Sequence, residues 1–537
     1  MASDMTGSLN GEASLTPSAE TAGPAARELE LKLVTDAGSV RSLACAPAVE
    51  ACARNKGVVR RLEAAYYDTS DQALQKAGYT LRVRRNGGRY VMTVKTSGTL
   101  APGTLARGEW EVPVDGLQPD ISRLMGQLPD DFPAALGDAE LVAQYTTSVR
   151  RRTRLLDLPY ATIELAADEG SVVAGERSEP INEIELELMK GDASALYELA
   201  LALSDSARLD PSPRSKAARG IDLARGVPPG FSKAPKLRFD AATSLDEVIA
   251  AILRSALQHL LDNKAAAVDG SHPEGVHQAR IALRRLRSML KILADTTGAQ
   301  ASERFRDQAK CLASAMNDAR NWDVFLSETL PPIEDKCAAV KGFAELRAAA
   351  EAKRRKGYET DRAAFDDPRS GRFQLEMALW IEQRGWRSSV DADGLAQLSA
   401  PARLYAEKVL AGLHRKVIKR GRQFGRLSVD ERHRVRLAMK KLRYAADFFL
   451  PLFGKSRKVA AYAKFLRRFQ DLLGKYNDMA TTEGLLTELQ AGDASPKLAG
   501  PCGAVIGWQA RDLLDTEAEL IAAWREFKKA GRMWKSK

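Results

Sequence analysis

Two stretches of the sequence, VHQARIALRRLRSMLK at residues 276–291 and RHRVRLAMKKLRYAADF at residues 432–448, decide the fold of the C-terminal half. In each, a histidine is followed by basic residues three, seven and ten positions later. On an α-helix these positions lie within about 80° of one another, so each stretch predicts a helix with a ridge of positive charge. The ridges are His277, Arg280, Arg284 and Arg287 in the first copy, and His433, Arg436, Lys440 and Arg443 in the second.

Both helices also carry an apolar stripe beside the ridge. The stripe is Leu283, Leu286, Leu290 and Leu293 in the first copy and Met439, Leu442, Ala446 and Phe449 in the second. The following segments are alike too, CLASAMNDARNWDVFL at 311–326 and DLLGKYNDMATTEGLL at 471–486. This repetition predicts a duplicated helical unit packed on its stripes. In a single such helix, the basic residues would most simply form a solvated face. Because the pattern recurs, we expect instead a cationic edge that binds a polyanion.

Composition narrows the class of protein and its partners. The chain has 537 residues, 45% of them hydrophobic and 28% charged, which is typical of a soluble protein with several domains. A net charge of +11 favours an anionic partner. We find no apolar run near 18 residues and expect no membrane partner. Five scattered cysteines without a C-x-x-C pair argue against a zinc site and suit the cytoplasm.

The chain changes character near residue 230. Before it, short runs alternate with period two, and after it the periodicity is helical. We expect four parts: a disordered leader at 1–26, a β-rich domain at 27–225, a linker at 226–242 and an all-α domain at 243–531. The linker prediction rests on three prolines and two glycines in RGVPPGFSKAPK at 225–236.

The predicted strands of the N-terminal domain have unusually charged faces. They are ELELKL (28–33), TLRVRR (80–85), RYVMTVK (89–95), RGEWEV (107–112), SVRRRTRLL (148–156), ATIELAADEG (161–170) and NEIELELM (182–189). An antiparallel sheet with one wet face is the plain alternative. Rows of like charges favour instead a closed barrel with a charged interior, in which carboxylates hold a divalent cation and basic groups hold phosphate oxygens.

These stretches resemble CYTH domains, the triphosphate tunnel metalloenzymes. ELELK at 28–32 is similar to the family's E-x-E-x-K signature, and YYDT (66–69), LRVR (81–84), TVK (93–95), RGEWEV (107–112), IELAADEG (163–170), EIELEL (183–188) and SKAARG (215–220) follow in the family's order. The resemblance covers about residues 27–225. It implies an eight-stranded antiparallel β tunnel with flanking helices that binds triphosphates with Mg²⁺ or Mn²⁺.

The paired ridge helices resemble a CHAD domain, the conserved histidine α-helical domain, over about 240–530. That resemblance implies two pseudo-symmetric helical bundles that bind inorganic polyphosphate through the eight ridge residues, in some proteins at polyphosphate granules. Proteins that join the two domains resemble bacterial inorganic triphosphatases most. The whole chain is therefore expected to be an α+β multidomain, cytoplasmic hydrolase.

The resemblance and the charged faces together suggest roles for particular residues. We expect Glu28, Glu30 and Lys32 to be catalytic. Substrate-binding residues are expected to be Arg82, Arg84, Lys95, Arg107, Arg152 and Lys216. Metal ligands are expected among Glu28, Glu30, Glu164, Asp168, Glu183, Glu185 and Glu187, where either Glu183/Glu185 or Glu185/Glu187 forms the second E-x-E pair. None of the five histidines precedes residue 259, which favours direct attack by water.

Other functions stay open at this stage. The protein could be a non-catalytic polyphosphate-binding or granule-associated protein, or a CYTH phosphatase acting on thiamine triphosphate, nucleotides or longer polyphosphate. The E-x-E-x-K carboxylates favour an enzyme, because a simple anion site gains nothing from acidic residues. No specific nucleic-acid binding is expected, because only 6% of residues are aromatic and none is interleaved with the ridges for base stacking.

Overall fold

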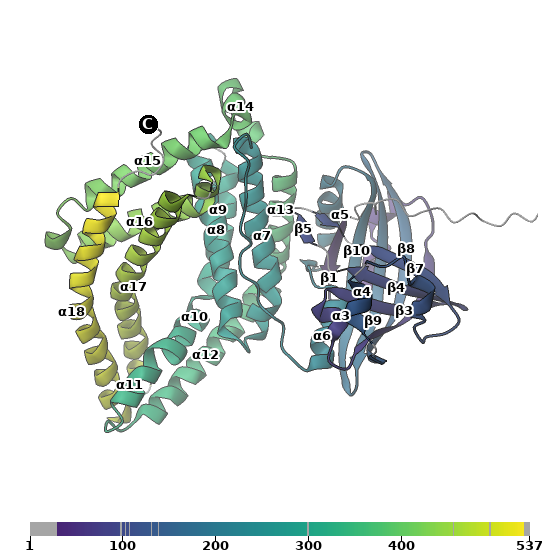
Figure 1. Cartoon of the computed structure of the whole chain (residues 1–537), viewed down its shortest axis with the longest axis horizontal. Helices are drawn as coiled ribbons and strands as arrows, with labels where there is room; N and C mark the ends of the chain where they lie inside the picture. Colours follow the sequence, from purple (N-terminus) through teal and green to yellow (C-terminus); the bar gives the residue numbers. More distant parts are fainter. Residues whose placement is uncertain are drawn as a thin grey trace, which may run out of the picture.

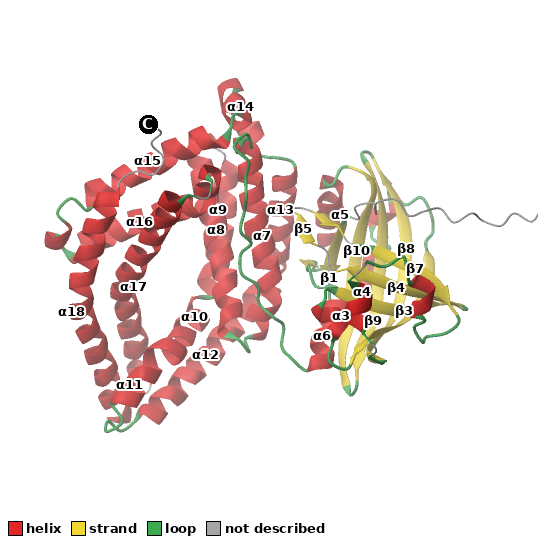
Figure 2. Ribbon diagram, in the orientation of Figure 1, coloured by secondary structure: helices red, strands yellow, loops and turns green. Residues whose placement is uncertain are grey.

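The computed structural model describes residues 29–530 except 97–98, 102–103, 107, 130, 138, 298–299, 455 and 493–495. The expected leader at 1–26 and two expected site residues, Glu28 and Arg107, lie outside the described residues. The N-terminal part is a β domain and the C-terminal part is helical (Figures 1 and 2).

The N-terminal domain is one antiparallel sheet of nine strands in the order β11-β1-β10-β9-β8-β2-β3-β4-β7. The strands are β1 (Glu30–Val34), β2 (Val58–Thr69), β3 (Tyr79–Asn86), β4 (Arg89–Thr96), β7 (Glu109–Val114), β8 (Leu141–Leu158), β9 (Ala161–Ala174), β10 (Arg177–Gly191) and β11 (Asp210–Pro211). A separate hairpin joins β5 (Thr99–Ala101) to β6 (Thr104–Ala106).

The expectation of a closed, eight-stranded tunnel was wrong in strand count and in closure. Within the described residues, the edge strands β7 and β11 are not paired with each other. Strand β11 is only two residues long, because Pro211 has no N–H for a ladder and Ser215 soon caps the helix α6 (Lys216–Arg225). Helix α6 packs against the interior strands β8, β9 and β10.

Alternation along the strands separates an apolar outer face from a charged inner one. The outer side chains, such as Leu33, Leu165 and Ile184, are fully buried under three helices. Those helices are α1 (Ser39–Leu43), α2 (Pro47–Glu50) and α5 (Ser194–Ser204). Two short helices, α3 (Ala73–Lys76) and α4 (Phe132–Leu136), cover the apolar side of β3 and β4. The charged side chains are therefore left on the concave side of the sheet.

The C-terminal domain contains twelve α-helices in the described residues, two of which carry the predicted ridges. They are α7 (Leu245–Asp269), α8 (Pro273–Thr297), α9 (Gln300–Ala315), α10 (Asn317–Val324), α11 (Leu330–Lys336), α12 (Phe343–Asp366), α13 (Pro368–Glu382), α14 (Ala392–Ser399), α15 (Ala402–Arg420), α16 (Val429–Phe449), α17 (Arg457–Gly492) and α18 (Ala499–Ala530). The ridge helices are α8 and α16. All eight apolar stripe residues are at most 1% exposed, which confirms that both helices pack on their stripes.

The two halves are not separate bundles, which corrects the expected layout. The largest apolar core contains residues of α7, α8 and α9 from the first half and of α15, α16 and α17 from the second. A second core joins Trp322, Phe325 and Leu346 to Leu486 and Val505, so the halves also meet at a second place. Figure 1 shows α16, α17 and α18 facing α8, α10 and α12, with α11 close to α18 at the far end.

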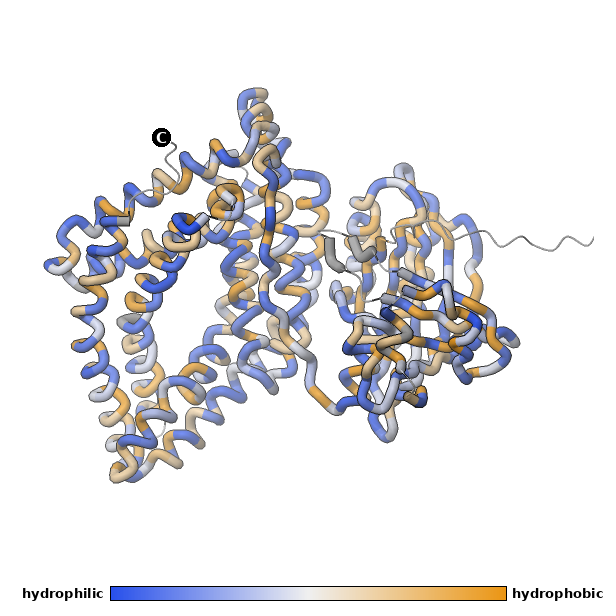
Figure 3. The backbone as a smooth tube through the Cα atoms, in the orientation of Figure 1, coloured by the Kyte–Doolittle hydropathy of each residue, from blue (hydrophilic) through white to orange (hydrophobic). Residues whose placement is uncertain are grey.

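Polar residues interrupt the apolar ones along the helices (Figure 3). Consistent with this pattern, none of the described helices is both long enough and apolar enough to cross a membrane.

Candidate functional site

The concave side of the sheet encloses a cavity of about 560 Å³ lined by many charged side chains. Strands supply nearly all of them, because alternate residues of a strand point to the same face. Helix α6 adds Lys216 at its first turn. The charged lining residues are Glu30, Lys32, Arg82, Arg84, Lys95, Glu109, Glu111, Arg151, Glu164, Asp168, Glu185, Glu187 and Lys216.

Three carboxylates form an acidic cluster on one wall of the cavity. Asp168 on β9 is paired directly with Glu183 on β10, and Glu185 follows two residues later on the same face. One oxygen from each carboxylate lies within 4.8 Å of the others. Asp168 and Glu183 are fully buried. Three negative charges at this spacing are stable only with cations beside them.

Lysine and arginine side chains supply those cations. The ammonium group of Lys216 lies 2.6 Å from Asp168 and 2.9 Å from Glu185, and it also pairs with Glu183. Lys32 pairs with Glu185 and lies 3.7 Å from Glu183. Burial alone would raise the pKa of Glu185, but Lys216, Lys32 and Arg151 together hold it well below its usual value. Burial would lower the pKa of Lys216, and the same carboxylates raise it instead.

The acidic cluster has the chemistry of a site for a hard divalent cation. Its donors are all carboxylate oxygens, which Mg²⁺ and Mn²⁺ prefer. Both oxygens of Glu183 are buried and accept no hydrogen bond from the described residues, although they lie in ion pairs with Lys216 and Arg219. Carboxylate oxygens that have lone pairs to spare in a buried site can serve as metal ligands. The residues present therefore fit such an ion.

The opposite wall of the cavity is basic. Arg82 and Arg84 are successive inward residues of β3, and Lys95 lies on the neighbouring strand β4. Lys95 pairs with Glu109 at 2.7 Å, and Arg82 lies 3.8 Å from Glu111. Burial, together with the charge of Arg82, lowers the pKa of Arg84 to about 10. An anion bound at this wall would offset the burial of Arg84 and its repulsion by Arg82.

The structure brings together most of the site residues expected from the sequence. Glu30, Lys32, Arg82, Arg84, Lys95, Glu164, Asp168, Glu185, Glu187 and Lys216 line the cavity, and Glu183 lies buried in the acidic cluster behind it. Glu183, Glu185 and Glu187 share one face of β10, as the alternation predicted. Only the first two belong to the acidic cluster with Asp168.

The expected role of Arg152 is wrong, because the alternation along β8 runs the other way. Arg152 points away from the cavity and donates to the Cys45 sulfur at 2.8 Å and to the carbonyl of Lys56. Its neighbour Arg151 lines the cavity and donates to both oxygens of Asp168 at 2.7 and 2.6 Å. Three consecutive arginines place charge on both faces, so alternation alone does not identify the inner one. The acidic partner Asp168 on β9, cross-strand from Arg151, would have distinguished them.

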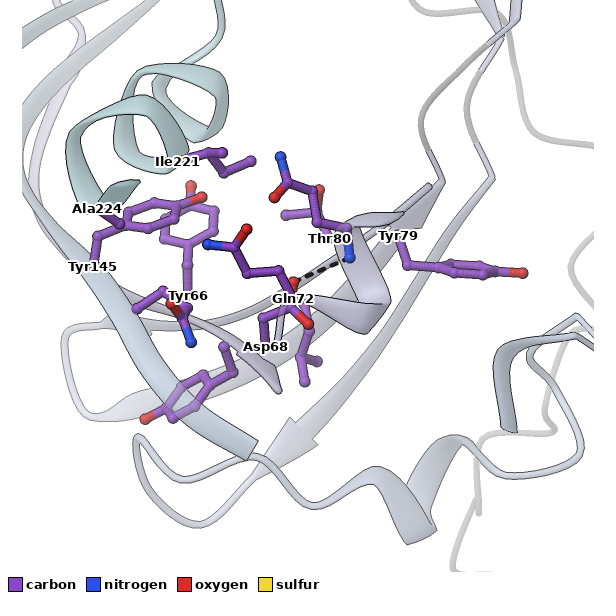
Figure 4. A pocket seen from close by; sticks show the side chains of 12 residues that line it. Tyr66, Asp68, Gln72, Tyr79, Thr80, Tyr145, Ile221 and Ala224 are labelled. Carbon is purple, nitrogen blue, oxygen red and sulfur yellow. Dashed lines mark hydrogen bonds between the residues drawn. The ribbon is translucent and has the colours of Figure 1, made fainter. Parts of the chain in front are cut away.

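A small pocket of about 30 Å³ adjoins one end of the cavity. Tyr66 and Tyr145 stack there with ring centroids 4.5 Å apart, next to Ile221 of α6 (Figure 4). Tyr66, Gln75 and Ile221 line both spaces. This pocket beside the stacked rings has room for about one water molecule, so the pocket itself does not hold a nucleobase.

The two ridges of the helical domain face each other and form one basic surface. Arg284 of α8 and Arg443 of α16 both lie 5.5 Å from the ring of Tyr444. Tyr444, which directly follows the second ridge, was not among the residues predicted from the sequence. Burial and then the charges of Arg436, Arg284 and Arg443 lower the pKa of Lys440 to about 8. Charges from both halves therefore act on one another across the domain.

The crowding of positive charge extends along the first ridge. Burial and the charges of Arg284 and Arg320 lower the pKa of Arg280 to about 10. Burial and Arg320 also lower the pKa of His277 to about 4. His277 is therefore neutral near pH 7, whereas the equivalent His433 is exposed. The repeat is thus symmetric in sequence but not in the surroundings of its histidines.

Comparisons with known proteins agree with this division of the chain. Residues 26–221 match the CYTH domain family and residues 251–487 match the CHAD domain family. An inorganic triphosphatase of Haemophilus influenzae is 32% identical over 159 residues, which are 29% of this chain and 44% of that protein. The matched region thus spans less than half the length of that relative.

Two further relatives cover more of the molecule. An uncharacterised protein of Mycobacterium tuberculosis is 26% identical over 498 residues, covering 88% of this chain and 91% of that protein. The crystal structure of the CHAD domain from the plant Ricinus communis is 29% identical, covers 56% of this chain and 98% of that chain, and has a TM-score of 0.48. From the two family matches, this chain consists of a CYTH domain followed by a CHAD domain.

Proposed function

We propose that the CYTH domain hydrolyses inorganic triphosphate with the help of a divalent metal ion, and that the CHAD domain binds inorganic polyphosphate. The observation that carries the first part is the cavity in which an acidic cluster faces a basic wall. A triphosphate brings about four to five negative charges, which the basic wall can neutralise, and the acidic cluster can hold the metal. The similarity to an inorganic triphosphatase supports the same substrate class.

Different cavity residues would have different roles in hydrolysis. Arg82, Arg84 and Arg151 would hold phosphate oxygens, since the planar guanidinium group makes paired contacts with them. Lys32 and Lys216 would exchange their carboxylate partners for phosphate oxygens when a metal ion occupies the acidic cluster. The bound metal ion would neutralise charge on the phosphoryl group that is transferred. Glu30, whose side chain is 41% exposed, would orient the attacking water.

The second part of the proposal concerns the joined ridges. They bring basic side chains close enough together that burial and mutual repulsion lower the pKa of Arg280 and of Lys440. A polyanion that threads between them would relieve this repulsion. Polyphosphate fits, because its charges are closely spaced along one chain.

Phosphate release from a panel of substrates tests the enzymatic proposal. The full-length protein would be incubated with triphosphate, thiamine triphosphate, ATP and long-chain polyphosphate, each with Mg²⁺, with Mn²⁺ and with EDTA. We expect triphosphate to be hydrolysed fastest and EDTA to stop the reaction. Binding of polyphosphate without release of phosphate from any substrate would support the alternative, a non-catalytic polyphosphate-binding protein.

The small pocket beside the cavity has too little space for the organic group of a triphosphate ester. The stacked tyrosines and Ile221 leave a volume of about 30 Å³ there. The adenosine group of ATP and the thiamine group of thiamine triphosphate would not fit in this space. If ATP or thiamine triphosphate were the better substrate, its organic group would have to lie outside this pocket.

A further inference from the structure

One short segment of the CYTH domain, residues 208–216, connects the cavity to the CHAD domain. At its C-terminal end Ser215 caps α6 and Lys216 reaches the acidic cluster. In its middle, β11 pairs with β1, and the amide of Ser212 donates to the carbonyl oxygen of Lys32 at 3.0 Å. The segment therefore holds the backbone of one cavity lysine and carries the other.

The N-terminal end of the same segment lies against the helical domain. Lys264 of α7 lies 2.8 Å from the carboxylate of Asp210, and this carboxylate also accepts a 2.5 Å hydrogen bond from Arg208. Arg208 in turn pairs with Asp366 at the end of α12. The backbone carbonyl of Leu209 packs so closely on Gly371 of α13 that a Cβ there would lie 2.2 Å from it. Side chains and backbone of the CHAD domain thus fix this segment in place.

The contact of Lys264 with Asp210 is buried. The Lys264 side chain is 15% exposed and that of Asp210 is 9% exposed. Burial lowers the pKa of Lys264, and Asp210 opposes this effect. Without the Lys264 ammonium group, this buried carboxylate would keep Arg208 but lose part of its charge compensation, so the substitution should displace Asp210 and β11.

We propose that Lys264 is a positioning residue for triphosphate hydrolysis: although it belongs to the CHAD domain, it fixes Asp210 and β11 and thereby aligns Lys32 and Lys216 in the CYTH cavity. This inference rests on the proposed function. A residue of the helical domain would then help to order the catalytic cavity of the CYTH domain. The path from Lys264 to Lys32 is short, because Asp210 pairs with Val34 of β1, two residues after Lys32.

The test compares two ion pairs of the same domain interface in the full-length protein. Lys264→Met removes the pair with Asp210. Arg372→Met is the matched control, because Arg372 of α13 pairs at 2.7 Å with Asp205, the residue after α5, which lies outside segment 208–216. Two quantities are measured: kcat and KM for triphosphate, and hydrogen exchange of the Ser212 amide without substrate.

We expect Lys264→Met to lower kcat about tenfold with less change in KM, because a displaced catalytic group costs rate more than binding. Exchange at Ser212 should rise about tenfold, as expected for local opening of β11. Lys264→Arg, which keeps the charge, should recover most of both. Arg372→Met should change each quantity less than twofold. Polyphosphate affinity should stay at the wild-type value in all three variants.

Equal effects of Lys264→Met and Arg372→Met would overturn the inference, because the pair would then contribute only to docking of the domains. If Lys264→Met does not fold, Asp210→Asn carries the same test from the other partner. Hydrogen exchange is measured without catalysis, so it separates this inference from the proposed function. A wild-type protein that releases no phosphate would refute only the proposed function. Unchanged exchange at Ser212 in Lys264→Met would refute the inference.

Discussion

At the residue scale, Arg151 and Arg152 show how one position decides a role. They are neighbours in β8, but Arg151 faces Asp168 inside the cavity and Arg152 faces Cys45 outside it. Sequence alternation identified the charged face of most strands correctly, because those strands carry charge on one face only. It failed where RRR places charge on both. The partner across the strand pair was needed, and a sequence alone does not show strand register.

This difference gives a direct test of the cavity. Arg151→Ala should raise the KM for triphosphate at least tenfold, because it removes one phosphate-binding cation and leaves Asp168 and Glu185 less compensated. Arg152→Ala is the matched control and should change KM less than twofold. Initial rates of phosphate release over a range of triphosphate concentrations would give both values. Equal effects of the two substitutions would mean that the assigned inner face of β8 is wrong.

The lowered pKa of Lys440 predicts that folding and polyphosphate binding of the CHAD domain are linked to proton binding. Its pKa is lowered from the ordinary 10.5 to about 8, so between these values the unfolded chain binds more protons and the free energy of unfolding rises with pH. A bound polyanion should raise the pKa again, so polyphosphate binding at pH 8.5 should take up protons. Titration calorimetry in buffers of different ionisation enthalpy measures this uptake.

The control for the proton linkage is Lys440→Arg, since arginine stays charged at this pH. The Lys440→Arg variant should still bind polyphosphate, but most of the proton uptake on binding should be lost. Uptake that persists unchanged in Lys440→Arg would assign the proton to another group.

At the scale of elements, the helices that carry the ridges were predictable and their mutual arrangement was not. The 3.6-residue periodicity of the stripes identified α8 and α16, and all eight stripe residues are buried. The repeat and the resemblance suggested two pseudo-symmetric bundles. The structure instead joins both halves through common cores, because long-range packing between α8 and α16 leaves no signal in either segment. Strand β11 has only two residues, too few to show an alternating pattern, and it was therefore not predicted from the sequence.

The joined ridges predict coupled rather than independent binding of polyphosphate. Arg284 and Arg443 both lie 5.5 Å from the ring of Tyr444, so one polyanion would contact both. Arg284→Ala and Arg443→Ala should each weaken binding about tenfold, and the double variant should lose less than the product of the two. Affinities measured over a salt series would also report the loss of counterion release.

Arg355, an exposed residue of α12, provides the off-ridge control for this experiment. Arg355→Ala should leave the affinity within about twofold of the wild type. Strict additivity of the two ridge substitutions would indicate two separate binding surfaces. An Arg355→Ala effect equal to theirs would indicate diffuse attraction to net charge.

At the scale of the whole molecule, the two domains form a continuous structure. Leu375 of α13 is fully buried within the apolar core of the CYTH domain, beside α5. Composition and linker signals predicted two domains, but they contain no information about the surface that each presents to the other. The interface mixes this apolar contact with the ion pairs around Asp210 and Asp205.

Leu375→Ala should destabilise the CYTH domain although the residue belongs to the CHAD domain. Truncation of a buried leucine costs about 2–5 kcal/mol. The expected result is a lower unfolding temperature for the transition of the β domain, followed by near-ultraviolet circular dichroism. Leu404→Ala is the control, because Leu404 is 70% exposed, and it should change little. Equal shifts would show that Leu375 contributes nothing to the domain interface.

The central claim is that two anion sites in one chain have different tasks, hydrolysis in the cavity and binding on the ridges. The most direct measurement is the initial rate of phosphate release from triphosphate by Glu185→Gln and by the ridge variant Arg284→Ala/Arg443→Ala, with Mg²⁺ or Mn²⁺ present. Glu185 belongs to the acidic cluster and pairs with Lys32, Arg151 and Lys216, so Glu185→Gln should lower the rate 10²-fold or more. The ridge variant should keep the wild-type rate. A wild-type rate in Glu185→Gln, or equal losses in both variants, would contradict the account.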